Sequence, residues 1–408
     1  MSARARVLRL LVLVMTSALV PRAYGQLAED PPPDRTALLL GSVKLWPLLD
    51  AGVERRSNVF QTTAADATPP QAATVWTGAP GFFAELPVSN SRVRIGYVAS
   101  YRDYGIEDVE ASWSHYARVD ARLVFGSGAI VEVADDLQRG VLDTREFDPG
   151  GDVTFKGERF HRNVARLGLG HERDDRSFFL RYQHVANRTV GERISGLYDV
   201  AGNEVAVSGD LRRSPRTWIS WEAQGSRSEL ERPTDSGTEF REVNGLTARV
   251  GGRGRIGPAS EWSFRGGWAD FKFEGATSSR YQGISLEGRW RRELAGGPAF
   301  SASLVREPYP LLGGVGDYYV SDQVLLEATT ASVRRLGGGV TLAYYGNRYP
   351  ELQPERKDRL LETEVWGRLR MKERLEWRIY ARRSSRSSSD PALDFDDDRI
   401  GTAIRIGG

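Results

Sequence analysis

Residues 109–125 read Val-Glu-Ala-Ser-Trp-Ser-His-Tyr-Ala-Arg-Val-Asp-Ala-Arg-Leu-Val-Phe. Apolar or small side chains occupy most odd positions of this stretch, and polar or charged side chains occupy most even positions. A period of two places successive side chains on opposite faces, so the stretch predicts a β-strand with one apolar and one polar face. It is also much longer than an ordinary strand of about 5–6 residues.

The same alternation recurs along the chain, for example over residues 93–101, 246–250, 361–371 and 375–382. No helical periodicity follows the first 25 residues. Short connections, such as Gly126-Ser127-Gly128, alternate with connections that are mostly longer. We predict 18 strands, centred near residues 49, 79, 97, 116, 134, 163, 182, 205, 221, 247, 267, 286, 302, 326, 343, 365, 380 and 400.

These features predict an all-β fold, a transmembrane antiparallel β-barrel of about 18 strands with short periplasmic turns and longer extracellular loops. The alternative is a secreted sandwich or propeller with a polar face toward bulk water. Long two-faced strands recur about every 20 residues here, unlike the 8–12-residue rhythm of those folds. The barrel is therefore the favoured architecture.

The composition excludes several classes of protein. The 408 residues include no Cys, so disulfide scaffolds, thiolate metal sites and a lipidated N-terminal cysteine are excluded. The 56 basic and 54 acidic residues give a formal charge of +2, which does not indicate a nucleic-acid partner. A mean hydropathy of −0.43 excludes a helical membrane protein but is compatible with a barrel, in which only alternate residues need be apolar.

The N-terminal sequence predicts export from the cytoplasm. Arg4, Arg6 and Arg9 precede an apolar run over residues 10–20, and Ala23-Tyr24-Gly25 suits cleavage before Gln26. We expect a signal peptide over residues 1–25, a periplasmic N-terminal linker over 26–40 and a barrel over 41–408. The expected location is the cell outer membrane.

A barrel of 16 to 18 strands encloses an aqueous lumen. Its polar parity predicts a lining that mixes Arg, carboxylates and Tyr, which could bind sugar hydroxyls. Opposite charges on neighbouring strands could equally serve only to stabilise a wet wall. The predicted lining residues are Arg94, Glu110, Tyr116, Arg118, Asp120, Arg122, Arg166, Arg181, Glu222, Arg249, Glu287, Arg289, Glu362, Glu364, Arg368, Glu376, Arg378, Tyr380 and Arg382.

Motifs for catalysis and cofactors are weak. A GxSxG nucleophile elbow is absent, and the four His have no evident catalytic partner, so we expect no enzyme and no cofactor. Asp394 and residues 396–398 could bind Ca²⁺, but a solvated rim without EF-hand spacing is the simpler interpretation. The basic stretch over residues 382–389 leads to the hypothesis of a contact with lipopolysaccharide phosphates.

Residues 45–60, Leu-Trp-Pro-Leu-Leu-Asp-Ala-Gly-Val-Glu-Arg-Arg-Ser-Asn-Val-Phe, suggest a family. They resemble the opening strand of outer-membrane porins encoded beside exopolysaccharide genes. Ala79-Pro80-Gly81 and the strand from Arg94 to Tyr104 are similar as well. The resemblance implies an 18-stranded polysaccharide export porin, as in myxobacterial members. It also implies a periplasmic polysaccharide export protein that lacks its own membrane span as the partner.

Three functions are therefore weighed. The first is the passage of a secreted polysaccharide, with outer-membrane lipid and lipopolysaccharide around the barrel. The second is a general or substrate-specific diffusion porin, which predicts a constriction from an inward-folded loop; the outer loops are short for that role. The third, a rim-active enzyme, requires a His-centred cluster that the sequence does not supply.

Overall fold

The computed structural model describes residues 37–63, 69–107, 109–141, 159–190, 197–234, 237–275, 278–295, 297–312, 316–333 and 335–407. Its elements are β1 (Leu38–Leu40), β2 (Val43–Arg56), β3 (Ala73–Val88), β4 (Ser91–Asp103), β5 (Ser112–Val124), β6 (Ala129–Val141), β7 (Arg159–Glu172), β8 (Arg176–Val190), β9 (Asp199–Ser214), β10 (Thr217–Thr234), β11 (Gly237–Arg255), β12 (Ser260–Glu274), β13 (Ser279–Glu293), β14 (Ala299–Pro310), β15 (Tyr318–Val333), β16 (Leu336–Tyr349), β17 (Arg356–Lys372), β18 (Leu375–Ser388), the 3₁₀ helix η3 (Pro391–Leu393) and β19 (Phe395–Gly407).

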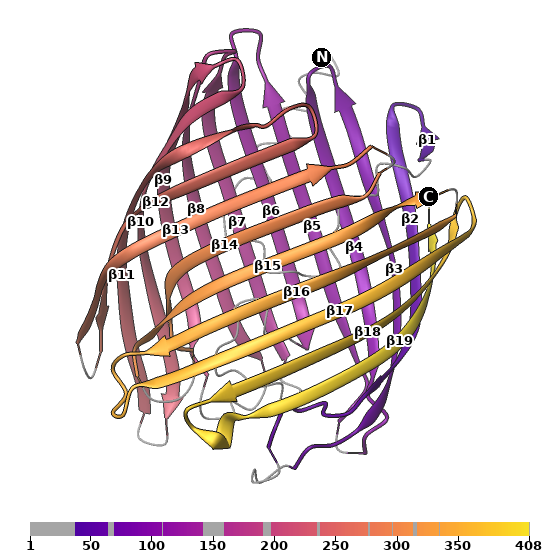
Figure 1. Ribbon diagram of the computed structural model, residues 1–408, viewed down its shortest axis with the longest axis vertical. Helices are drawn as coiled ribbons and strands as arrows, with labels where there is room; N and C mark the ends of the chain where they lie inside the picture. Colours follow the sequence, from indigo (N-terminus) through magenta and orange to yellow (C-terminus); the bar gives the residue numbers. More distant parts are fainter. Residues whose placement is uncertain are drawn as a thin grey trace.

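Strands β2 to β19 form a closed antiparallel barrel, in which each strand pairs with its neighbours in sequence (Figure 1). Closure comes from β19 and β2, which pair from Arg399↔Arg56 to Gly407↔Leu48. Closure removes the unpaired edges of the sheet, as a membrane-spanning sheet requires. All 18 predicted strands are confirmed. Among the described residues, no helix is long and apolar enough to cross a membrane.

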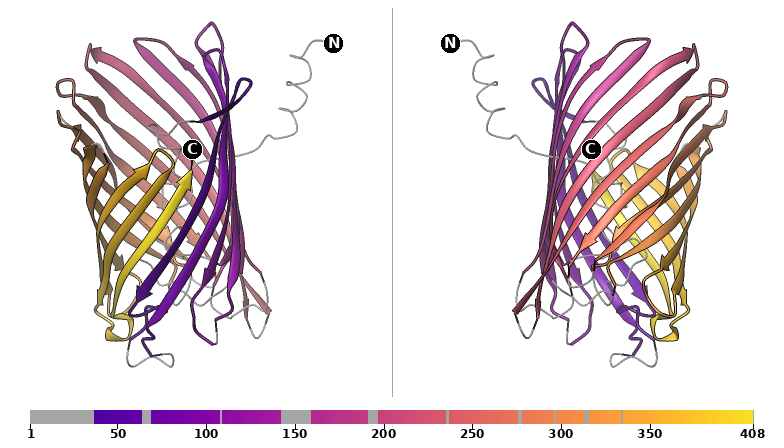
Figure 2. Two further views of the ribbon diagram at one scale, coloured as in Figure 1. Left: turned by 90° about the vertical axis from the view of Figure 1, so that its right-hand side faces the viewer. Right: turned by 90° about the vertical axis from the view of Figure 1, so that its left-hand side faces the viewer.

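The connections confirm the predicted alternation of short and long segments. One end of the barrel carries short turns, such as residues 125–128 and 373–374, and also the start of β2 and the end of β19. The other end carries mostly longer segments, such as 57–72 and 104–111. Side views show the strands tilted between these two ends (Figure 2). The long-loop end is the extracellular end of an outer-membrane barrel.

The predicted N-terminal segments lie largely outside the described residues. Residues 1–36 include the predicted signal peptide and most of the predicted linker over 26–40. The last three residues of that linker form β1, which pairs with β2 from Leu38↔Leu45 to Leu40↔Val43 at the short-turn end. Sequence alternation could not find a strand of three identical Leu side chains.

The outer face of the barrel is apolar and fully accessible. Large side chains such as Ile95, Trp113, Leu246 and Trp268 are 45–60% exposed although they lie in well-paired strands. Water would penalise such a continuous apolar surface, whereas lipid chains match it. The barrel is therefore integral to the outer membrane.

Candidate functional site

The lumen-facing wall carries the predicted lining residues. All of them except Glu110 lie within strands, and on each strand they alternate with exposed apolar side chains. On β5, for example, Tyr116 and Arg118 have the parity opposite to exposed Trp113. Glu110 differs because β5 begins only at Ser112.

The placement of Glu110 corrects the sequence analysis. Its side chain is 89% exposed in the segment before β5, and its carboxylate lies 3.7 Å from the Arg159 guanidinium. Alternation extends through Val109 by chance, but the strand ends where pairing with β4 ends, at Arg102↔Ser112. Period-two patterns locate a strand well and its terminus poorly.

A first network of ion pairs crosses β4 to β8. Arg94 Nε is 3.0 Å from Asp120, and Arg118 Nε is 3.6 Å from Asp136 on the next strand. Arg166 on β7 approaches the second oxygen of Asp136 at 3.1 Å. The chain of charges therefore alternates in sign from strand to strand.

The other predicted residues on this side continue the network. Arg122 contacts Glu132 at 2.8 Å, and Arg181 lies 3.9 Å from the second oxygen of the same carboxylate. Arg181 also donates to Ser208 at 3.1 Å. The hydroxyl of Tyr116 donates to Asp136 at 3.4 Å.

A second network follows β17, β18, β19 and β2. Arg382 pairs with Glu362 at 2.9 Å, and Arg378 pairs with Glu364 at 2.6 Å. Nearer the periplasm, Arg368 lies 3.6 Å from Glu376. The Tyr380 hydroxyl donates to Glu54 at 2.7 Å, which extends the network across the barrel closure to β2.

A third network lies on β10 to β14. Arg249 donates to Glu222 at 3.0 Å, to Ser285 at 2.8 Å and to Glu307. Arg265 bridges Glu222 at 2.8 Å and Glu287 at 2.6 Å, and Arg289 lies 3.2 Å from Glu287.

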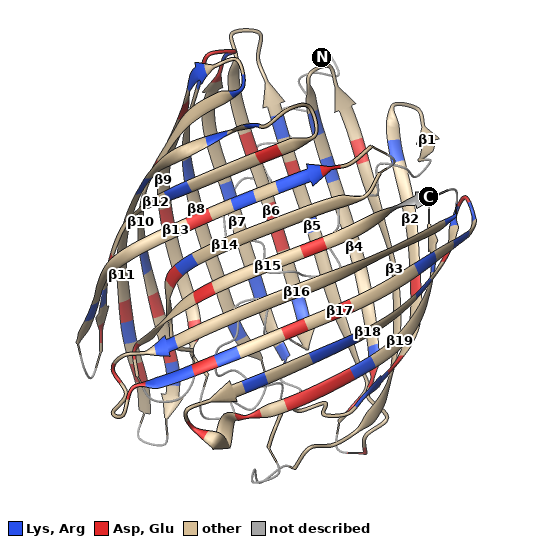
Figure 3. Ribbon diagram, in the orientation of Figure 1, with Lys and Arg blue, Asp and Glu red and all other residues tan. Residues whose placement is uncertain are grey.

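The three networks make the inner wall polar, with Arg and carboxylate groups interleaved. Each predicted carboxylate within a strand has an Arg partner in the structure. Blue and red segments accordingly lie close together on neighbouring strands (Figure 3). Asp136, Arg265 and Glu307 also belong to these networks but were not among the predicted lining residues. Each has the lumen-facing parity of its strand, which is the signal that could have identified it. The role of this wall as a pore lining stays a prediction.

Near the extracellular end, the wall separates between β13 and β14, and the ends of β14 and β15 bend toward the lumen. Pairing between β13 and β14 stops at Leu286↔Arg306, although β13 begins at Ser279 and β14 ends at Pro310. Strand β14 stays paired with β15 up to Pro310↔Tyr318. Strand β15 in turn stays paired with β16 up to Val320↔Arg348, so β14 and β15 bend inward together as a hairpin that is still attached to β16.

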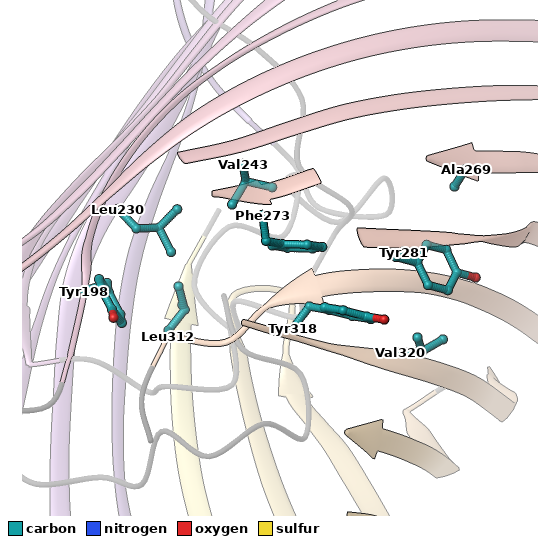
Figure 4. Packing of buried hydrophobic residues seen from close by; sticks show 9 residues of the cluster. All are labelled: Tyr198, Leu230, Val243, Ala269, Phe273, Tyr281, Leu312, Tyr318 and Val320. Carbon is teal, nitrogen blue, oxygen red and sulfur yellow. The ribbon is translucent and has the colours of Figure 1, made fainter. Parts of the chain in front are cut away.

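The bent hairpin covers a buried apolar cluster inside the barrel (Figure 4). Tyr318 belongs to β15, but its ring stacks on Phe273 of β12 at 4.8 Å and meets Tyr281 of β13 edge-on at 6.0 Å. Phe273 and Tyr281 have lumen-facing parity and are at most 9% exposed. Burial of these rings makes the inward bend favourable.

Two extracellular connections meet over this cluster. The backbone N–H of Tyr198, before β9, donates to the carbonyl of Leu312, after β14, at 3.1 Å. The Tyr198 hydroxyl donates to Glu239 at 2.6 Å, and the guanidinium of Arg232 lies 4.6 Å from the ring centroid. Burial, together with the hydrogen bond to Glu239, raises the pKa of the Tyr198 hydroxyl, which therefore remains a donor at physiological pH.

This arrangement narrows the extracellular side of the lumen, and it differs from the expectation that the outer loops are too short for a constriction. Strand bending, rather than loop length, brings the connections inward. One feature of the sequence could have indicated this inward bend. Apolar residues such as Leu230, Val243 and Phe273 occupy lumen-facing positions near strand ends, where polar residues are expected.

Charged residues of the basic stretch over 382–389 and of the acidic stretch over 394–398 form ion pairs within the protein. In the basic stretch, Arg383 faces outward and lies 3.3 Å from Asp396 and 3.5 Å from Asp398. Asp397 is buried and accepts from Arg56 at 2.9 Å and from Arg399 at 2.7 Å. In the described part of the chain, no group of three or more His or carboxylates could hold a metal ion.

Comparison with protein-family models gives no match, and comparison with curated proteins gives none either. Solved structures with a similar course include OccAB3 of Acinetobacter baumannii, with 11% identity, a TM-score of 0.49 and coverage of 90% of this chain and 99% of that one. The outer membrane protein OpdK of Pseudomonas aeruginosa gives 10% identity, a TM-score of 0.46 and coverage of 90% and 99%. The alcaligin receptor FauA of Bordetella pertussis gives 10% identity, a TM-score of 0.45 and coverage of 90% of this chain and 76% of that one. The barrel assignment rests on the closed strand pairing of this chain itself.

Proposed function

We propose that this barrel provides the outer-membrane passage for a secreted polysaccharide, such as an exopolysaccharide, a capsule or a spore coat, in a flippase- and polymerase-dependent export pathway. The observation that supports this proposal most strongly is the set of three Arg–carboxylate networks on the inner wall. They present many hydrogen-bonding groups, in which Arg and carboxylate charges are interleaved and paired.

Such a wall suits a long hydroxylated chain. Paired Arg and carboxylate groups, such as Arg378 with Glu364, retain spare donors and acceptors that sugar hydroxyls can exchange with water. A run of unpaired charges of one sign would hold an ionic substrate in place. Paired charges of opposite sign allow a chain to slide along the wall through many weak and interchangeable contacts.

The proposed partner is a periplasmic polysaccharide export protein without a membrane span of its own. It would dock at the short-turn end, where both β1 and the end of β19 lie. Short turns such as residues 213–216 and 373–374 leave this rim accessible. The resemblance of residues 45–60 to export porins favours this partner over a soluble substrate-binding protein.

A second candidate is a substrate-selective diffusion channel. The contact between Tyr198 and Leu312 favours it, because an inward constriction is the feature expected of a selective porin. Under the export proposal, the same constriction closes the extracellular end of the lumen, and the polysaccharide must displace it to leave the barrel.

Gene deletion separates the two candidates. Under the export proposal, the deletion abolishes polysaccharide at the cell surface, the polymer accumulates inside the cell, and the wild-type gene restores display. Surface polysaccharide at wild-type level in the deletion strain would overturn the export proposal. Under the diffusion-channel candidate, the deletion leaves the polymer in place and slows growth on a limiting polar solute.

A further inference from the structure

Four basic or titratable side chains form a continuous row on the outer wall of β5 to β8. His115 pairs in register with Arg139, Arg139 with His161, and His161 with Arg188. They share the outward parity of exposed residues such as Leu137, and all four are themselves exposed. Directly opposed side chains on neighbouring strands lie within about 4.5–5.5 Å at Cβ, so the row brings two guanidinium and two imidazole groups together on the outer wall.

No acidic partner is recorded for the Arg side chains of this row among the described residues. Elsewhere on the outward face, Arg227 pairs with Glu242 at 2.7 Å, Arg280 with Asp270 at 2.5 Å and Arg383 with Asp396 at 3.3 Å. In register, His161 separates the two Arg, which lie on β6 and β8. Both guanidinium groups are therefore available to an anion from outside the chain.

A shallow pocket lies directly below the row. Its lining includes the four row residues together with the next outward positions on the same strands, Ala117, Leu137, Asn163 and Ala186. The two Ala side chains leave the depression, and Leu137 gives it an apolar wall. Asp135 is the next outward position on β6 toward the periplasm after Leu137. Its carboxylate accepts a hydrogen bond from Asn163 at 2.7 Å.

The position of the row corresponds to the head-group level of the outer leaflet. Each of its residues is the third or fourth from the extracellular end of its strand. Trp113, one outward position above His115, is 52% exposed and packs against Tyr101 at 5.3 Å between ring centroids. Aromatic side chains of this kind mark the membrane–water interface.

We propose that this pocket binds a phosphate-bearing glycolipid of the outer leaflet, with its phosphate on Arg139 and Arg188 and an acyl chain over Ala117, Leu137 and Ala186. Guanidinium groups bind phosphate through charge-assisted hydrogen bonds. A basic edge above an apolar floor matches an anionic amphiphile better than it matches either a free anion or an uncharged lipid. The site does not depend on what the lumen transports.

Native mass spectrometry of the full-length barrel in detergent tests the site with three probes. They are diphosphorylated lipid A, the same acylated disaccharide without phosphates, and inorganic phosphate. The wild type is expected to retain the diphosphorylated lipid. In the variant R139Q/R188Q, affinity for this lipid should fall about tenfold or more, because two charge-assisted contacts are lost.

The matched control is R383Q, which removes an outward Arg that Asp396 and Asp398 already neutralise, and it should bind lipid like the wild type. Heat-modifiable gel mobility confirms that each variant is a folded barrel. Equal binding of the phosphate-free lipid would overturn the proposal. Unchanged binding by R139Q/R188Q, or inorganic phosphate binding as tightly as the lipid, would do so as well.

Discussion

The buried ion pair between Asp358 and Arg386 provides a quantitative test of the inner wall. These side chains are 1% and 3% exposed, and Arg386 Nη2 lies 2.5 Å from Asp358 Oδ2. Asp358 also accepts from the Ser388 hydroxyl and lies 3.3 Å from Arg356 Nε. The substitution D358N keeps the shape of the side chain but leaves two buried guanidinium groups without their shared countercharge.

We expect D358N to lower the free energy of unfolding by about 3–5 kcal/mol, the usual cost of removing one partner from a buried pair. Equilibrium unfolding in urea, with the barrel in phospholipid vesicles, measures this value through the fluorescence of its 10 Trp residues. The double variant D358N/R386Q should be less destabilised than the sum of the single changes, because it also removes a buried charge.

The control for this prediction is E242Q. Its partner Arg227 lies at 2.7 Å, but the two side chains are 60% (Arg227) and 31% (Glu242) exposed. An exposed pair of this kind contributes at most about 1 kcal/mol. A loss below about 1 kcal/mol for D358N, or equal losses for D358N and E242Q, would refute the argument that the inner networks are structural.

Three further predictions concern the turns and the constriction. G128A should destabilise the barrel by about 1 kcal/mol or more, measured by the same urea unfolding, since Gly128 has φ +84° and an added Cβ would lie 2.5 Å from the Glu172 carbonyl. F273A should cost about 3–5 kcal/mol in that assay, because the ring is 3% exposed and stacked on Tyr318. In planar bilayers, Y318A should raise the single-channel conductance, because the cluster that holds the β14–β15 hairpin in the lumen is weakened; an unchanged conductance would contradict this role.

The alternation of apolar and polar side chains was enough to predict the strands, because each strand has one face toward lipid and one toward water. On β5, Trp113 faces the membrane while Arg118 faces the lumen. Positions of one parity are therefore apolar and positions of the other parity are polar. The inner ion pairs were predictable as a parity set but not as specific cross-strand partners. Arg118 lies 3.5 Å from Asp120 on its own strand, whereas only the register of β5 and β6 places it 3.6 Å from Asp136.

The constriction could not be predicted from alternation. Phe273, Tyr281 and Tyr318 contact one another across β12, β13 and β15, and the bend that unites them depends on pairing that stops between β13 and β14. No short sequence window contains that information. The basic row on β5 to β8 was missed for a related reason, because His115, Arg139, His161 and Arg188 become neighbours only through register.

The central claim is that a polysaccharide passes through the lumen, and the absence of cysteine allows a direct test. Y116C places a single thiol on the inner wall, and V119C places one on the outer face of the same strand. Each variant would replace the wild type in producing cells, with labelling of Y116C by a membrane-impermeant polyethylene-glycol thiol reagent verified by mass. V119C faces lipid, so the same reagent should leave it unlabelled, and it serves as the control for other effects of the reagent. We predict that labelled Y116C slows the appearance of new surface polysaccharide while V119C does not; export at the unlabelled rate through fully labelled Y116C would contradict the account.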